Sequence, residues 1–235
     1  MRISVEDVHV QGRREALLEQ VSLGLGMGEA VLVAGDPGQG HTALALVTTG
    51  RLVPTTGRVT LVDDDGTVIE SPARLRAVTA VVDLPGISEP EEMLTVRTVV
   101  AEGLALARRP SLPGDADRWL TEHRLADRVH DRVDQLEGPV RTALLATLAV
   151  EREQVRFIVL ALPDRHGGEP SGWWDVAREL SSAGYGVLAQ CTRSAARDLG
   201  ADIPPAQGAD ARRATPREVM RVPAVSAAGH AEAAP

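Results

Sequence analysis

A glycine-rich turn between an apolar run and a helix-forming run holds the residues best suited to chemistry. It matches the phosphate-binding pattern of glycine, four residues, glycine, lysine and a hydroxyl residue, except that the lysine is a histidine. Glycines let successive backbone N–H groups point at an anion, and the following helix start adds a positive dipole. We therefore predict a phosphate site, although the pattern also fits a turn without a ligand; its residues are Gly35, Asp36, Pro37, Gly38, Gln39, Gly40, His41 and Thr42.

The histidine at position 41 weakens the charge of this predicted site. All 25 basic residues of the chain are arginines, so no lysine ammonium group is present. A histidine has a reference pKa near 6.5, so roughly a quarter of the side chain is protonated at pH 7. The helix start should lower the pKa of His41, and a bound phosphate should raise it. Thr42 keeps a hydroxyl group that could bind Mg²⁺.

Composition limits the class of protein. The chain has 235 residues, 43% of them hydrophobic, and a formal net charge of -8, which argues against a nucleic-acid binder with a basic face. Cys191 is the only cysteine, so an intrachain disulfide is excluded. We see neither a signal peptide nor an apolar run of membrane-spanning length, and we expect a cytoplasmic protein that could dock on a membrane protein.

Apolar patterning predicts alternating strands and helices, which is typical of an α/β fold with a largely parallel sheet. An edge-type strand is expected over residues 2–10 and a hairpin over 57–70. Buried strands are expected over 29–34, 77–82, 157–161 and 186–190. Helices are expected over 42–48, 95–108, 115–128, 140–152 and 173–183. Residues 204–235 are rich in Ala, Pro, Gly and Arg, and we expect a mostly disordered tail there.

Several segments in a fixed order resemble the ATP-binding subunits of ABC transporters. The phosphate turn runs on to the stretch from Thr49 to Val59, followed by Leu84-Pro85-Gly86, Leu94 to Arg97, Leu136 to Ala149, Phe157 to Pro163 and Gly184 to Leu188. The resemblance covers about residues 2–203. It implies an ABC-type P-loop NTPase core with a parallel-rich sheet, an antiparallel β subdomain and a helical subdomain at about 87–150. Residues 1–203 would form one nucleotide-binding domain.

The resemblance also places the family's functional positions, most of which have changed. Gly12 falls where an aromatic ring stacks on adenine, and Asp83 falls at the glutamine that senses Mg²⁺, so Thr42 and Asp83 become the candidate metal ligands. The γ-phosphate-capping signature falls at Leu136, Glu137 and Gly138. The Mg²⁺-holding aspartate and the general base are replaced by Ala161 and Leu162, and the switch histidine by Thr192. Asp164 and His166 are nearby residues that could substitute.

These losses together imply a subunit that hydrolyses ATP poorly or not at all. Loss of a general base alone costs about 10²–10⁴-fold in rate, and phosphoryl transfer depends almost entirely on positioning and electrostatics. The resemblance implies weak or absent binding of ATP and Mg²⁺, an integral membrane subunit as partner, and a dimer with itself or with another ATP-binding subunit. Two alternatives remain: an ATPase that borrows groups from a partner, and a free-standing anion or nucleotide sensor.

Overall fold

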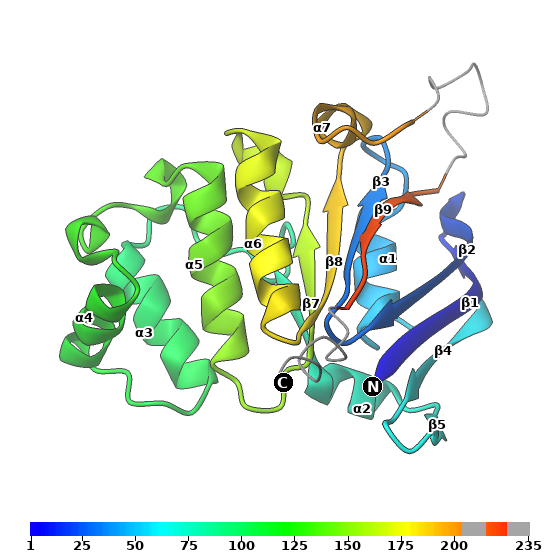
Figure 1. Cartoon of the computed structure of the whole chain (residues 1–235), viewed down its shortest axis with the longest axis horizontal. Helices are drawn as coiled ribbons and strands as arrows, with labels where there is room; N and C mark the ends of the chain where they lie inside the picture. The colour runs from blue at the N-terminus through cyan, green and yellow to red at the C-terminus, as the bar shows by residue number, and fades with distance from the viewer. Residues whose placement is uncertain (204–214, 225–235) are drawn as a thin grey trace, which may run out of the picture.

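Two β-sheets of different kinds organise the computed structural model, which describes residues 1–203 and 215–224 (Figure 1). The first sheet is antiparallel and has the order β2-β1-β4-β5. Its strands are β1 (Arg2–Gln11), β2 (Ala16–Gly26), β4 (Thr56–Val62) and β5 (Val68–Ile69). Strand β1 pairs with β2 on one side and β4 on the other. The prediction of an edge strand over 2–10 was therefore wrong, because alternating apolar residues also suit an inner strand with one buried face.

The second sheet is the central one and has the order β6-β7-β8-β3-β9. Its strands are β3 (Ala30–Ala34), β6 (Thr79–Val82), β7 (Phe157–Ala161), β8 (Gly186–Cys191) and β9 (Arg217–Val222). The first four are parallel to one another, and β9 pairs antiparallel with β3. Every residue of β3, β7 and β8 is buried, as expected for parallel strands covered on both faces. The predicted α/β class is confirmed.

Helices cover both faces of the central sheet. Figure 1 shows α5 and α6 on one side and α1 on the other, next to the antiparallel sheet. Successive strand residues point to opposite faces, so Val31 and Val33 join the core around α1, whereas Leu32 joins the core under α6. The α-helices are α1 (His41–Thr48), α2 (Pro72–Val78), α3 (Val96–Leu106), α4 (Pro113–Glu122), α5 (Gly138–Val150), α6 (Pro170–Ser182) and α7 (Arg193–Asp198).

A third core lies among α3, α4 and α5, within the range predicted as a helical subdomain. Short 3-10 helices, η1 (Ala126–Arg128) and η2 (Val133–Gln135), connect α4 to α5, and η3 (Pro163–His166) follows β7. This core contains Val100, Trp119, Leu120 and Leu144 and is separate from the cores of the two sheets. Within the described ranges, every helix is too short or too polar to cross a bilayer.

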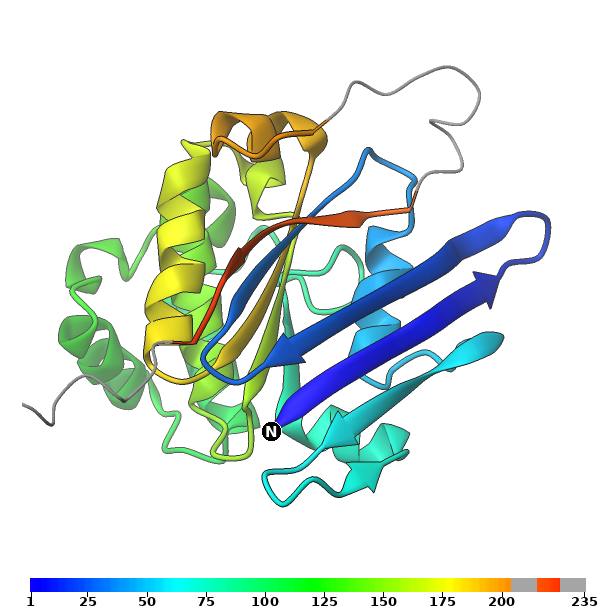
Figure 2. The same cartoon turned by 45° about the vertical axis from the view of Figure 1, so that its right-hand side comes forward.

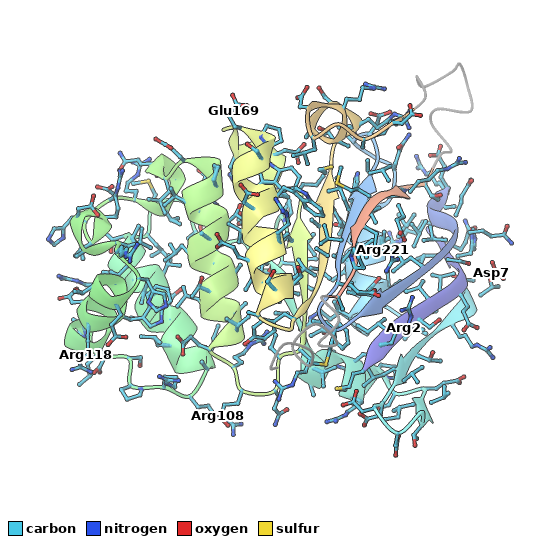
Figure 3. All side chains as sticks on the ribbon, in the orientation of Figure 1. Arg2, Asp7, Arg108, Arg118, Glu169 and Arg221 are labelled. Atoms are coloured by element: carbon cyan, nitrogen blue, oxygen red, sulfur yellow. The ribbon has the colours of Figure 1, made fainter. Side chains whose placement is uncertain are left out.

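Strand β9 corrects part of the tail prediction. Residues 204–235 were expected to be disordered, but Arg217–Val222 pair with β3 along its whole length. Arg221, labelled in Figure 3, donates to Glu29 Oε2 at 2.6 Å and to the Gly24 carbonyl at 2.9 Å, so it ties β9 to β2 and to the connection before β3. Residues 204–214 and 225–235 lie outside the described part of the chain.

Candidate functional site

The predicted phosphate turn connects the end of β3 to the start of α1. Gly38 and Gly40 have φ values of 87° and 88°, in the left-handed region that glycine adopts without strain. Gln39 closes the turn: its side-chain Oε1 accepts from the Asp36 N–H at 2.7 Å, and its own N–H donates to the Asp36 carbonyl at 3.1 Å. The N–H groups of Gly38 and Gly40 donate to no residue that the structure describes. Free amide N–H groups at a helix start can donate hydrogen bonds to an anion.

His41 fills the inside of this turn. Its side chain is only 5% exposed, and a Cβ built on Gly35 would lie 3.0 Å from its Nε2. Neither ring nitrogen has a hydrogen-bond partner among the described residues. Burial lowers the pKa of His41 below its ordinary value, although the Gly35 backbone and the carboxylates of Asp164 and Asp36 oppose that shift. The ring is therefore neutral at pH 7 and supplies no point charge.

The positions that should hold Mg²⁺ and activate water carry no acid. Thr42 is exposed at the mouth of the turn. Ala161 ends β7 and is buried. Leu162 has a left-handed backbone, with φ 51°, and lines the same cleft as Thr42. A methyl group and an isobutyl group can neither ligate a metal nor take up a proton, so Thr42 supplies the one metal-binding oxygen among these three side chains.

Asp164, a candidate substitute for the missing base, uses one carboxylate oxygen to hold Thr192. Its Oδ2 accepts from the Thr192 N–H at 2.9 Å and from the Thr192 hydroxyl at 2.6 Å. Thr192 in turn caps α7, since its side chain accepts from the Ala195 N–H. The two positions thus form a structural link between η3 and α7. Neither has an imidazole that could contact a γ-phosphate.

Asp83, the other candidate metal ligand, is already surrounded by basic side chains. Arg141 donates to both carboxylate oxygens at 2.8 Å each, Arg165 lies 3.2 Å from Oδ1, and His166 Nε2 lies 2.8 Å from Oδ2. Burial alone would raise the pKa of Asp83, but the hydrogen bonds and charges of Arg141 and His166 more than offset this and hold it far below its usual range. The carboxylate is ionised and engaged by these side chains, and Asp83, Glu89 and His166 each bring a potential ligand atom within 4.8 Å of the others.

The signature-like segment forms the start of α5. Leu136 is buried in the helical core, and Glu137 is exposed at the N-cap without a side-chain capping bond. Gly138 packs so tightly that a Cβ there would lie 2.2 Å from the Gly167 carbonyl. Pro139 follows and has no N–H. In this segment Glu137 is therefore the exposed polar group, and its charge opposes phosphate.

A cleft of about 970 Å³ opens beside the turn. The phosphate turn and α1 line the cleft, together with Leu162. The connection between β1 and β2 adds Arg13, Arg14 and Glu15 to the lining. Figure 2 shows this connection at the same end of the molecule as the loop between β3 and α1. Sequence reasoning missed Arg13 and Arg14, although two adjacent arginines directly after Gly12 were a visible signal.

Comparisons with known proteins agree on the fold. The nucleotide-free ATP-binding cassette of an ABC transporter matches with TM-score 0.60 and 20% identity, over 82% of each chain. A dimeric bacterial ABC transporter cassette matches with TM-score 0.60 and 19% identity, over 83% of this chain and 90% of that one. The CbiO1 protein of Clostridium perfringens, part of the ABC transporter complex CbiONQ, matches with TM-score 0.57 and 19% identity, over 81% and 77%.

The sequence match is more local. The taurine import ATP-binding protein TauB of Pseudomonas aeruginosa is 38% identical over 68 residues, which span 29% of this chain and 25% of that protein. No protein-family model matches the chain. The chain therefore has the fold of the ATP-binding cassettes of ABC transporters.

Proposed function

We propose that this chain is a cassette subunit of a membrane transport complex that binds a phosphate-bearing nucleotide and does not hydrolyse it. The observation that carries this proposal is the contrast between the two sides of the cleft. On one side the glycine turn, its free amides and the Thr42 hydroxyl are present. On the other side Leu162, which follows the buried Ala161, provides neither a metal ligand nor a proton acceptor. Such a subunit holds nucleotide as a structural or regulatory half-site.

The partners follow from the same proposal. The similar proteins include a dimeric cassette and a member of a transporter complex, so we propose a dimer with another cassette, bound to an integral membrane subunit at the cytoplasmic face. A groove of about 390 Å³ between residues 81–90 and helices α3 and α5 offers a place for the membrane subunit. Ile87 and Leu106 line it and are 54% and 78% exposed.

Calorimetry with MgATP, together with phosphate release by the purified full chain, tests the function. We expect saturable binding and a turnover of about 10⁻² s⁻¹ or less, from ordinary enzyme rates of about 1 s⁻¹ or more reduced by the lost base. Turnover near 1 s⁻¹ would instead show an active ATPase.

A negative charge introduced next to the phosphate turn tests whether the nucleotide binds there. Thr42→Glu places an acid in the first turn of α1, where it suits the helix dipole but repels phosphate. Ser171→Glu is the matched control, because Ser171 is exposed in the first turn of α6, outside the cleft. Binding should weaken at least about tenfold in the first variant and stay unchanged in the second. Equal affinities would place the ligand elsewhere.

A further inference from the structure

The connection between β1 and β2 brings two unpaired cations to the phosphate cleft. Arg13 and Arg14 line the cleft and are exposed, and neither forms an ion pair or hydrogen bond with any residue in the described ranges. Glu15 is the carboxylate beside them in the lining. Arg13, Arg14 and Glu15 together give this wall one net positive charge.

The backbone fixes this connection next to the turn. The Gly12 N–H donates to the Glu15 carbonyl at 2.9 Å and closes the tip. At its base, a Cβ on Gly40 would lie 2.5 Å from the Leu17 carbonyl, so β2 begins in direct contact with the phosphate turn. The two arginines are thus carried on a strand pair anchored at the last glycine before α1.

The turn itself shows a second sign of an anion site. His41 is a polar side chain that is 95% buried, lines the cleft and leaves both ring nitrogens unpartnered. A buried polar group without a partner is costly unless a ligand or water satisfies it. A phosphate at the turn could accept from the free amides of Gly38 and Gly40, and the unpartnered His41 ring lines the same cleft.

The cleft offers no aromatic ring to a nucleobase. The chain has three tryptophans, one tyrosine and one phenylalanine, and none of them lines the cleft. Trp119 lies in the helical core, and Phe157, Trp173 and Trp174 are buried around the central sheet. Next to Gly12, where the resemblance places a ring, the Leu17 side chain takes up the space, 3.1 Å from where a Cβ would lie.

We infer that the cleft recognises the polyphosphate chain of its ligand without selecting the base, and that Arg13 and Arg14 supply the positive charge that a loop lysine would give. This inference rests on the proposed function and narrows its ligand to triphosphates as a chemical class, with or without a nucleoside. A guanidinium group suits this task because it stays charged and matches the geometry of phosphate oxygens.

Calorimetry with Mg²⁺ and inorganic triphosphate, ATP, GTP or CTP tests the inference on the full chain. We expect the four dissociation constants to agree within about tenfold. In Arg13→Ala/Arg14→Ala each affinity should fall about tenfold, as expected for two exposed charge-assisted contacts. Arg74→Ala/Arg197→Ala removes the same charge from exposed positions on α2 and α7 and should bind like the unmodified chain.

Each other outcome has a distinct meaning. If ATP binds more than about tenfold tighter than GTP, CTP and triphosphate, the base is selected and the inference is wrong. If the double variant binds ATP more weakly but triphosphate as before, the arginines stack on the base. That result would also overturn the inference. If the unmodified chain binds none of the four, or if Thr42→Glu binds them all equally well, the proposed function itself fails at this cleft.

Discussion

Asp83 and Arg141 form a buried ion pair that joins the end of β6 to the first turn of α5. Two hydrogen bonds of 2.8 Å connect the guanidinium group to the two carboxylate oxygens, and the side chains are 6% and 2% exposed. Arg165 extends the pair by reaching Asp83 at 3.2 Å and Glu89 at 2.8 Å. A position that the resemblance assigns to metal sensing is therefore engaged in a link between the central sheet and the helical region.

Breaking this pair should destabilise the fold strongly. Asp83→Asn keeps the size and shape of the side chain and tolerates the positive φ of 58°, but it leaves Arg141 buried without its counter-charge. It should lower the free energy of unfolding by about 3–5 kcal/mol. Arg141→Met should cost less, because Arg165 and His166 still contact Asp83. The double variant should lose much less than the sum. Urea unfolding measures the free energy of unfolding of the two single variants and the double variant. A loss below about 1 kcal/mol in each single variant would contradict a structural role.

The Asp83–Arg141 pair also shows which features of the site the sequence does not predict. The phosphate turn, its histidine and the missing acids were predictable, because each depends on a local pattern of residues. The partners of Asp83 were not, since Arg141 lies 58 positions away along the chain and only the folded arrangement brings it there. Arg13 and Arg14 are visible in the sequence as adjacent arginines. Their position beside the phosphate turn was not predictable, because it depends on where the connection between β1 and β2 lies in the fold.

The strands can likewise be divided into those that the sequence predicts and one that it does not. Continuous apolar runs predicted β3, β6, β7 and β8, because strands buried on both faces have a clear composition. Strand β9 was missed, since Arg217–Val222 mixes charged and apolar residues without strict alternation, within a segment rich in Ala and Pro. It is stabilised by its place against β3 and by Arg221 rather than by its own composition.

Acid should destabilise the protein through His41. In the unfolded chain His41 takes up a proton near its ordinary pKa of about 6.5, whereas burial lowers its pKa in the fold. The unfolded state then binds more protons, so the free energy of unfolding should decrease as the pH falls from about 7 to about 5. In His41→Gln this dependence should be shallower, and in His130→Gln, at an exposed histidine, it should stay as in the unmodified chain. Equal slopes in all three would refute the assignment.

Removal of β9 should expose the edge of β3. A chain ending at Ile203 loses the antiparallel partner of β3 and the bonds of Arg221, so its backbone groups at that edge have no partner strand. We expect a melting temperature lower by ~5 °C or more and a tendency to associate through the exposed edge. A chain ending at Ala224 keeps β9 and is the control. Differential scanning calorimetry and size-exclusion chromatography compare them, and identical behaviour would show that β9 contributes little.

The groove beside α3 gives the proposed membrane partner a testable contact. Leu106 lines it and is 78% exposed, and the neighbouring Arg51 and Arg152 have no carboxylate partner among the described residues. An apolar segment that carries an acid would suit this surface.

Leu106→Asp places a charge on the apolar part of the groove lining. We expect this variant to move from the membrane fraction to the supernatant of lysed cells, because burying the charge against a partner costs more than the lost contact. Leu112→Asp is the matched control, since Leu112 is 73% exposed and lies outside the groove. If both variants stay with the membrane, the partner binds another face. If both leave it, general surface polarity rather than the groove controls the attachment.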